Sequence, residues 1–500
     1  DMVMGDTDLC PYDAGTWGSL TTRFADPVIR AAACEAREIL KTLGAEHLGV
    51  NKEAVSAKNG KVFVLGDPTK KVSYAALTQG KKIVKSLDIK PAIKKAEDFK
   101  IIGKDIISLD AEAKVTGTAQ YSGDILLPGM VHASIVRSLS FGAKKIAVDA
   151  SGIEAFEGVE LIDEGDLVAV VHSDPEVATK AAKKVIVTWE EPEEKTNNEA
   201  VFDYLTSTIK NGRNFEESGD LNVGKETSTH FIEASYHDGY KAHAPMETHT
   251  ATCYFEGDEL TMWCSTQTPF GTRDQVARAL EIAQEKVHIK PIFIGGGFGG
   301  KIYNQQAVEA ALISRACGKP VQVAWTRKEE FLFDRFRPAA VVNVRSGVDA
   351  NGKMTSWEFD IYCAGTRGTK LFYEVPNNRT RMFDERNVHP VATGAWRAPG
   401  NNTTTFARES HIDVMANAVG IDALKFRLLN LKDEDLKKTL ELAAKKFKWN
   451  RTKKTGHGFG IALGVDAGTK VAIITEVHVD KTTGKVTPVR IVCAQDMGQV

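Results

Sequence analysis

A glycine-rich stretch constrains this chain more than any other feature. Residues 295–300 contain five glycines, with Phe298 as the single side chain among them. The apolar run 287–294 before it predicts a strand, and residues 304–317 after it have the apolar spacing of a helix that stops at Gly318. Glycine permits positive φ and lets a ligand approach bare backbone. Strand, glycine loop and helix in this order predict a phosphate cradle, because N–H groups converge where the helix dipole is positive.

Two nucleotide-binding fingerprints fit this loop only in part. Gly295, Gly297 and Gly300 match the dinucleotide pattern, but no acidic residue closes a second strand about 20 positions later. Gly300 and Lys301 nearly form a nucleotide P-loop, yet Ile302 replaces the hydroxyl residue that would hold magnesium. A tight turn without a ligand is the remaining alternative. The loop alone therefore leaves its ligand open.

Composition excludes several classes of protein. The 64 lysines and arginines balance 66 acidic residues to a net charge of −2, and no like-charged block is present, which argues against a nucleic-acid surface. No apolar run reaches the roughly 18 residues of a membrane span. Seven scattered cysteines without CxxC spacing do not form an iron–sulfur or zinc site by themselves. With 42% hydrophobic residues, the 500-residue chain predicts two to four domains with sizeable cores.

Local patterns divide the chain into three regions of an α+β protein. In residues 1–99, Asp26 as cap and Pro27 in the first turn predict a core-facing helix through residue 48. In residues 100–195 the sequence pattern becomes that of short strands and tight turns. It predicts an inserted small α/β domain bounded by the solvated acidic linker 190–198. In residues 196–500 strands and helices alternate as in a mixed lobe. Helices are predicted there near residues 273–283, 305–317, 409–431 and 435–447.

Several spaced motifs accompany the glycine loop. They are residues 263–270 (WCSTQTPF), residues 394–400 (GAWRAPG), Lys114 to Gly117 (KVTG), Asp124, residues 128–130 (PGM), and Arg137 with Ser138. Together they resemble the molybdenum-cofactor subunit of the xanthine oxidase family. Residues 5–8 (GDTD) and 15–19 (GTWGS) precede the Lys114 motif here, whereas in most of the family such a stretch comes late. This order is similar to the isoquinoline 1-oxidoreductase type, and it implies a molybdopterin-binding lobe with a hammerhead-like insert.

The resemblance implies catalytic roles for Gln267, Phe298 and Arg397. Gln267 would face the apical oxygen of molybdenum, for which its amide offers a donor and an acceptor; capping of the next helix is the alternative. The backbone N–H groups of Phe298 and Gly299 would lie beside the metal. Arg397 carries a planar guanidinium that could grip a phosphate or a substrate carboxylate, and its alternative is a surface salt bridge.

The resemblance also implies a set of cofactor-binding residues, with no protein ligand to the metal. The predicted set is Gly15, Thr16, Gly18, Ser19 and Thr21, then Gly296, Gly297, Phe298, Gly299 and Gly300, and finally Ala398. The first five would bind the pyrophosphate of a dinucleotide form, although such stretches are otherwise ordinary turns. Ala398 stands where the carbon monoxide dehydrogenases of the family carry a copper-binding cysteine, so a copper–molybdenum site is not expected.

Five further histidine or glutamate positions are given structural or open roles. His243 and His249 flank Glu247, but their spacing is poor for a metal site, so we predict structural roles. Glu329 and Glu330 belong to a charged helix start. The family's catalytic Gly-Glu motif has no match before Val500, so we expect a fragment or processed chain whose general base lies elsewhere, with Glu247 as the first substitute.

The function implied by the resemblance is that of a molybdenum hydroxylase subunit. It would oxidise an aldehyde or hydroxylate an N-heterocyclic carbon with oxygen from water, using molybdopterin cytosine dinucleotide with molybdenum. Electrons would leave through a small [2Fe-2S] partner subunit, with a cytochrome c as a further candidate acceptor. The resemblance suggests the periplasm, and a cytoplasmic location stays open. The alternatives are a catalytically silent pterin carrier or assembly protein, and a nicotinamide-dependent dehydrogenase, which the missing ribose-binding acid disfavours.

Overall fold

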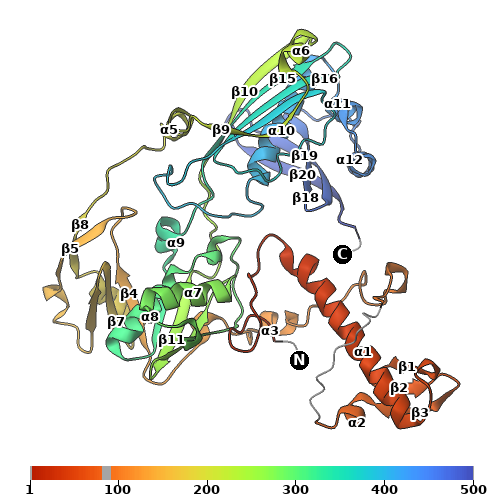
Figure 1. Cartoon of the computed structure of the whole chain (residues 1–500). Coiled ribbons are helices and arrows are strands. Elements are labelled where there is room, and N and C mark those ends of the chain that lie inside the picture. The colour runs from red at the N-terminus through yellow and green to blue at the C-terminus, as the bar shows by residue number, and fades with distance from the viewer. Residues whose placement is uncertain (1–2, 81–91, 499–500) are drawn as a thin grey trace. The chain divides into compact units, whose positions relative to one another are not determined.

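The computed structural model describes residues 3–80 and 92–498 (Figure 1). Their contacts divide the chain into two units. One comprises Asp1–Gly15 and Glu112–Gly498, and the other Thr16–Ala111. Helices and strands are mixed throughout, which confirms the predicted α+β class. No described helix combines the length and the apolar character needed to cross a bilayer.

The smaller unit is a long helix packed on a three-stranded antiparallel sheet. It contains α1 (Asp26–Leu48), β1 (Val55–Lys58), β2 (Lys61–Val64), β3 (Asp67–Ser73) and α2 (Tyr74–Thr78). The predicted span of α1 is confirmed, and Ala45 packs against Val62 in its core. The predicted cap is wrong, because a π-helical turn at Thr21–Ala25 leads directly into α1 and Asp26 is already helical. The sequence pattern also predicts a helix over residues 74–86; its first part is α2, and residues 81–86 lie outside the described part.

The larger unit contains a seven-stranded mixed sheet in the order β13-β12-β11-β14-β4-β7-β6. The strands are β4 (Val131–Val136), β6 (Glu160–Glu164), β7 (Leu167–His172), β11 (Thr250–Glu256), β12 (Glu259–Cys264), β13 (Val287–Lys290) and β14 (Val321–Ala324). The helices α7 (Pro269–Leu280) and α8 (Gln305–Cys317) pack against this sheet (Figure 1), and α4 (Pro175–Ala182) packs on β4 and β7. Alanine, valine and isoleucine fill the interface, which holds the ends of β12 and β13 in fixed positions.

This sheet crosses the border predicted near residue 195. β4 pairs in parallel with β14, placing Val131 opposite Val321, and β7 and β6 follow on the same side. Only β5 (Lys144–Asp149) and β8 (Ile186–Glu190) form a separate two-stranded sheet among the described residues. The contacts divide the chain after Gly15 and Ala111 instead. The division into residues 1–99, 100–195 and 196–500 stays a prediction.

We expect proteolysis of the linker 190–198 to nick the chain without releasing two products. The linker is exposed apart from Thr196, so a protease can reach it. The hydrogen bonds between β4 and β14 remain on both sides of the cut. Denaturing electrophoresis should show two bands where native size exclusion shows one peak. Separate native peaks would contradict the shared sheet and favour an independent insert.

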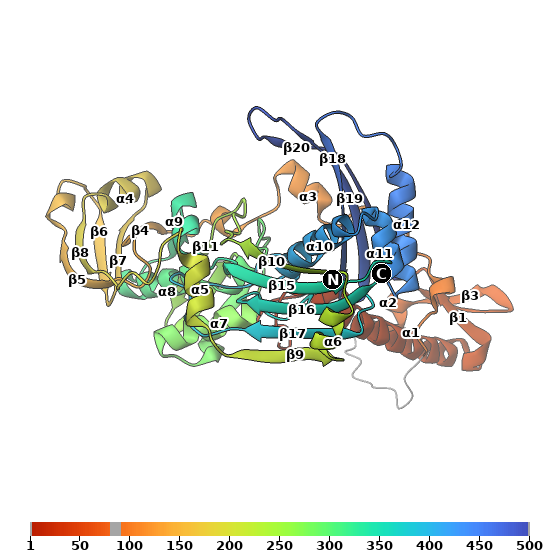
Figure 2. The same ribbon diagram turned by 90° about the horizontal axis from the view of Figure 1, so that it is seen from above.

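A second sheet in this unit has the order β10-β15-β16-β17-β9. Figure 2 shows its strands side by side. They are β9 (Gly212–Ser218), β10 (His230–Asp238), β15 (Ala340–Val348), β16 (Met354–Tyr362) and β17 (Asn377–Phe383). The short helices α5 (Val201–Thr208) and α6 (Leu221–Glu226) contact this sheet, and α3 (Ala111–Thr116) and α9 (Arg327–Phe333) are further short helices of the chain.

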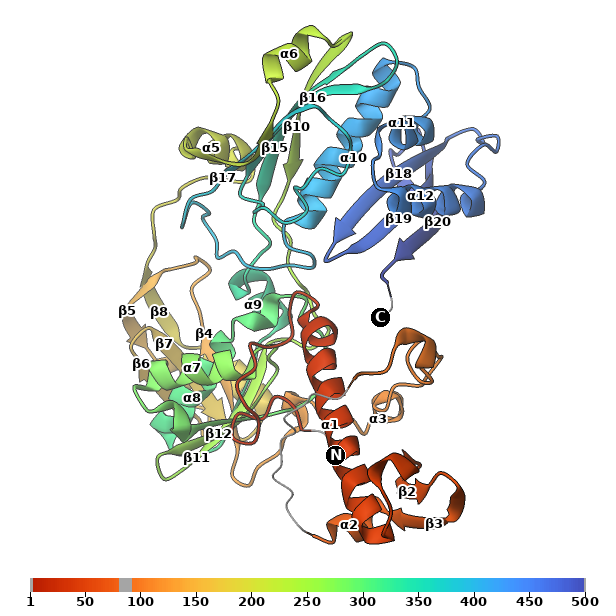
Figure 3. The ribbon, with the colours of Figure 1, turned by 45° about the vertical axis from the view of Figure 1, so that its right-hand side comes forward.

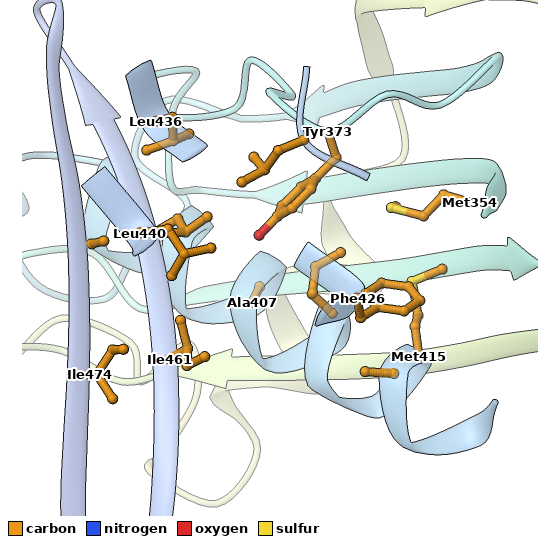
Figure 4. Packing of buried hydrophobic residues seen from close by; sticks show 14 of the residues in the cluster. Met354, Tyr373, Ala407, Met415, Phe426, Leu436, Leu440, Ile461 and Ile474 are labelled. Carbon is orange, nitrogen blue, oxygen red and sulfur yellow. The ribbon is translucent and has the colours of Figure 1, made fainter. Parts of the chain in front are cut away.

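Three helices and a further antiparallel sheet share one core with these strands. The helices are α10 (Asn401–Ala418), α11 (Ala423–Asn430) and α12 (Glu434–Phe447), and the strands are β18 (His457–Asp466), β19 (Thr469–Val479) and β20 (Val486–Asp496). α12 lies along this sheet (Figure 3), and Phe426, Leu440 and Ile461 all belong to this core (Figure 4). The single helix predicted at residues 409–431 is wrong, because Gly420 at φ +66° ends α10 and a turn precedes α11.

Candidate functional site

The glycine loop lies between β13 and α8, but it is not the N-terminus of α8. Gly296, Phe298 and Gly299 have φ values of +95°, +56° and +111°, and a short 3₁₀ turn, Gly300–Ile302, separates them from the helix start at Gln305. The phosphate cradle predicted at a helix N-terminus is therefore not formed. The loop is instead a backbone bend that bears almost no side chains, in which Gly297, Gly299 and Gly300 are buried and Phe298 is exposed.

Protein acceptors bind several N–H groups of this loop. The N–H of Gly295 donates to Glu247 Oε2 at 2.7 Å, and that of Gly299 donates to Gln267 Oε1 at 2.9 Å. The N–H of Gly300 donates to the Gly297 carbonyl at 2.9 Å. These bonds fix the shape of the bend before any ligand is present. A pre-organised backbone of this kind suits a ligand that must be held in one orientation.

Glu247 joins the two ends of the loop. Its Oε2 accepts a hydrogen bond from Lys301 Nζ at 2.7 Å in addition to the one from Gly295. The Lys301 side chain is completely buried, and Glu247 Oε1 is buried without a hydrogen-bond partner among the described residues. The geometry supports the structural role predicted for Glu247. The sequence did not predict Lys301 as the partner of Glu247, because the two residues lie 54 positions apart and no local sequence pattern connects them.

Gln267 packs directly against the glycine loop. Its backbone N–H donates to the Lys301 carbonyl at 2.8 Å, and a Cβ at Gly297 would lie 2.4 Å from Gln267 Oε1. Only glycine at position 297 leaves room for this amide. The alternative role as a cap of α7 is not seen, because Thr268 occupies the N-cap position.

Arg397 approaches the loop from the segment 394–400. Its N–H donates to the Phe298 carbonyl at 3.0 Å, and its guanidinium carbon lies 4.1 Å from the centroid of the Phe298 ring. A Cβ at Gly299 would lie 2.2 Å from the Ala395 carbonyl oxygen, so the two segments are in backbone contact. Arg397 is exposed and forms no salt bridge with any described residue. The next residue, Ala398, has φ +56°.

The predicted residues thus come together only in part. Gln267 and Arg397 both contact the Phe298–Gly299 bend, whereas a common pocket for these residues and their roles toward a cofactor stay predictions. Gly15 joins them: it has φ +102°, and a Cβ there would lie 2.4 Å from the Gln267 carbonyl oxygen. The remaining predicted pyrophosphate residues belong to the smaller unit, and their role also stays a prediction. They are Thr16, Gly18, Ser19 and Thr21.

Both histidines beside Glu247 are used inside the protein. His243 Nδ1 lies 2.7 Å from Asp334 Oδ2, and its Nε2 lies 2.7 Å from the Ala395 carbonyl. His249 Nδ1 lies 2.8 Å from Glu330 Oε1. No group of three or more potential metal-binding side chains occurs in the described part of the chain. The two histidines therefore connect the loop segments to α9 rather than offer ligands to a metal.

Two cavities lie beside these segments. One, of about 1140 Å³, is lined by residues 392–395 and by Pro399 and Gly400 of the Arg397 segment. The other, of about 670 Å³, is lined by Tyr12, Thr268, Ile302 and Tyr303, among others. Both are bounded by Phe141, Arg335 and Ala392. Neither Gln267, Arg397 nor any residue of the loop 295–300 lines either cavity, so the cavities adjoin the neighbouring segments rather than the bend itself.

Comparison with known proteins identifies the family. Two models described as molybdopterin cofactor-binding domain match residues 205–431 and 1–122. The chain is 26% identical over 551 residues to a nicotinate dehydrogenase subunit of Pseudomonas putida, a match that covers all of this chain and 46% of that protein. The beta subunit of isoquinoline 1-oxidoreductase from Brevundimonas diminuta is 27% identical over 451 residues, covering 82% of this chain and 57% of that protein. The chain belongs to the molybdopterin-binding proteins of the xanthine oxidase family.

Solved structures of two oxidoreductases share the fold. Quinoline 2-oxidoreductase from Pseudomonas putida 86 superposes with a TM-score of 0.61 at 21% identity, over 79% of this chain and 62% of that one. Aldehyde oxidoreductase from Desulfovibrio gigas gives 0.60 at 19% identity, over 77% and 52%. The chain spans about half the length of the curated relatives reported above.

Proposed function

We propose that the chain is the molybdenum-binding part of a hydroxylase that oxidises an aldehyde or hydroxylates an N-heterocyclic carbon with oxygen from water. The observation that carries the proposal is the meeting of Gln267, the Phe298–Gly299 bend and Arg397 around one pre-organised backbone. The relatives are named as nicotinate, isoquinoline and aldehyde oxidoreductase subunits, which supports this class of reaction.

The residues around the loop fit a pterin-bound metal. A Cβ at Gly297 or Gly299 would collide with Gln267 or Ala395, so glycine at these positions lets both segments pack against the bend. A ligand would approach from the side of Phe298 and Arg397, which are exposed. Gln267, the backbone at Phe298 and Gly299, and Arg397 would hold the group. When bound, the molybdenum centre supplies the redox chemistry and activates water. The proposed form is the cytosine dinucleotide, with its pyrophosphate on Gly15, Thr16, Gly18, Ser19 and Thr21.

The chain's own residues contribute orientation rather than electron transfer. Gln267 fixes the Gly299 amide, and Glu247 with Lys301 fixes the ends of the bend. Arg397 places a cation at the bend, stacked on Phe298. We propose that electrons pass to a separate [2Fe-2S] subunit, with a cytochrome c as a later acceptor. Alanine at position 398 supports a site without copper.

The proposal predicts that Gln267→Ala lowers turnover by about 10²-fold, the usual cost of removing one pre-organised polar group from an active site. The full protein with its native partner subunits is assayed by dye reduction with an aldehyde and an N-heterocycle, at equal molybdenum content. Gln284→Ala, at an exposed position away from the loop, is the matched control and should keep full activity. A wild-type protein that holds the pterin but oxidises no substrate would favour a carrier instead.

A further inference from the structure

Residues 5–15, here called the strap, pair with the strand from which the glycine loop starts. The N–H of Thr7 donates to the Ile289 carbonyl at 3.2 Å, and the N–H of Ile289 donates to Thr7 Oγ1 at 2.9 Å. Ile289 belongs to β13, which is an edge strand among the described strands of the seven-stranded sheet. The strap covers this edge, whose backbone groups would otherwise lack partners.

The other end of the strap reaches Gln267. On its way the strap passes the start of α7, where the Tyr12 ring meets the Phe270 ring edge-on at a centroid distance of 5.5 Å. A Cβ at Gly15 would lie 2.4 Å from the Gln267 carbonyl oxygen, so the two backbones are in direct contact. Gln267 Oε1 in turn accepts the N–H of Gly299 at the bend. The strap thus connects β13 with the residue that fixes the Gly299 amide.

His288 on β13 lies between two carboxylates of the strap. Its Nε2 lies 2.9 Å from Asp6 Oδ1, and its Nδ1 lies 3.3 Å from Asp8 Oδ2. A histidine ring donates from both nitrogens only when it is protonated, so this geometry fits an imidazolium between two anions. Hydrogen bonds between charged groups are roughly twice as strong as neutral ones. His288 therefore anchors the strap where it joins the sheet.

Asp6 is the central residue of this anchor. It is 6% exposed, and its Oδ1 accepts the N–H groups of Asp8 and Leu9, each at 3.0 Å, as well as His288. Burial acts to raise the pKa of Asp6, but the two N–H groups and His288 outweigh it and hold the pKa below its usual range. Asp6 is therefore charged at neutral pH. One oxygen both shapes the turn of the strap and binds β13.

Between its two ends the strap has little burial of its own. Leu9 and Tyr12 are 73% and 72% exposed. Two of its hydrogen bonds are internal, from the Cys10 N–H to the Asp6 carbonyl and from the Gly15 N–H to Asp13 Oδ1. A segment with few buried contacts opens easily unless its ends are fixed. The anchor at His288 therefore determines where Gly15 lies against Gln267.

We propose that His288 is a positioning residue of the site: through Asp6 and Asp8 it holds the strap, and the strap holds Gln267 against the Gly299 N–H. Removal of the imidazolium releases the strap, and the Gln267 amide then loses its fixed orientation. The consequence for turnover rests on the proposed function, because Gln267 acts there on the bound group. The link from His288 to Gly299 is independent of that function and is measured as amide protection.

Hydrogen exchange of backbone amides tests this link in the full protein with its native partners. We expect His288→Leu to speed exchange at Thr7 and at Gly299 by about 10- to 100-fold, since a charged anchor and the bond that depends on it are lost. The strands β15 and β16 serve as the internal reference and should not change. His230→Leu, at an exposed position of β10, is the matched control. Faster exchange at Thr7 with an unchanged Gly299 amide would make the anchor purely local and overturn the inference.

Gly15→Ala perturbs the far end of the strap. Its Cβ collides with the Gln267 carbonyl, so we expect faster exchange at Gly299 while Thr7 stays protected. The double variant His288→Leu with Gly15→Ala should exchange at Gly299 within about threefold of His288→Leu alone, because the collision disappears once the strap is released. Effects that multiply in the double variant would show two independent causes and overturn the inference.

Kinetics separate positioning from loss of the cofactor. At equal molybdenum content, His288→Leu should lower kcat by about 10-fold and change KM by less than about threefold, as for a displaced orienting group. His288→Gln keeps one donor for Asp6 and should lie between. Turnover of His288→Leu equal to that of an active wild type would overturn the positioning role. If wild type oxidises no substrate, the proposed function fails and hydrogen exchange still decides the inference. Should the reference strands also exchange faster, Asp8→Asn, at a half-exposed carboxylate, replaces His288→Leu with the same expected pattern.

Discussion

Replacement of Glu247 by glutamine is expected to destabilise the protein by about 3–5 kcal/mol, because the buried Lys301 ammonium loses its carboxylate partner. The N–H of Gly295 loses a charged acceptor at the same time, so the bend is no longer held at either end. We therefore also expect molybdenum and pterin contents to fall. Urea unfolding gives the stability, and metal and pterin analysis of the purified protein gives the occupancy.

Two variants make this prediction specific. Glu256→Gln removes an exposed carboxylate at the end of β11 and should change stability by less than about 0.5 kcal/mol. The double variant Glu247→Gln with Lys301→Met removes both charges, and it should be more stable than Glu247→Gln alone, since no unpaired charge is left buried. A double variant no better than the single one would show that the ion pair does not hold the bend.

The second large effect is expected at Arg427, in the core between α10, α11 and β18. Its guanidinium is completely buried, lies 3.1 Å from Glu409 Oε2 and 2.6 Å from Asp413 Oδ1, and donates to the Ile461 carbonyl at 2.9 Å. Arg427→Met removes a positive charge that neutralises the buried Glu409 carboxylate. It also leaves the Ile461 carbonyl without the hydrogen bond that Arg427 donates. We expect a loss of about 3–5 kcal/mol in the free energy of unfolding, measured with urea.

Lys425→Met provides the control for this core. Lys425 is an exposed residue two positions earlier in the same helix, so it has the same helical context without the buried network. Its replacement should change stability by less than about 0.5 kcal/mol. An Arg427→Met variant as stable as Lys425→Met would mean that the buried network contributes no net stability, as can occur when a hydrophobic side chain fills the space.

Patterns that depend on neighbouring residues were predicted well. The span of α1 follows from Pro27 and its apolar spacing, and the span of α8 follows from the spacing that ends before Gly318. Errors arose where one residue changed the course of the backbone. Gly420 divides the helix predicted at residues 409–431, and a preceding π-helical turn replaces the cap expected at Asp26.

Contacts between distant segments could not be derived from single residues. The resemblance brought Gln267, Phe298 and Arg397 into one site, and the structure shows how backbone hydrogen bonds hold them together. Lys301 follows the glycine loop, and a lysine in a loop is normally exposed to solvent. Its side chain is nevertheless buried, where its ammonium pairs with the Glu247 carboxylate. The position of His288 beside Asp6 gives no signal in the sequence, because the two residues lie 282 positions apart. Such pairings depend on tertiary packing, which a local pattern does not encode.

The central claim is that the bend at residues 295–300 holds a molybdenum-bearing pterin. The most direct measurement is the molybdenum and pterin content of the full protein purified with its partners from cells that make the cofactor. We predict about one molybdenum and one pterin per chain, together with a clear loss of both in Glu247→Gln and none in Glu256→Gln. A folded wild-type protein that carries neither molybdenum nor pterin would contradict the claim.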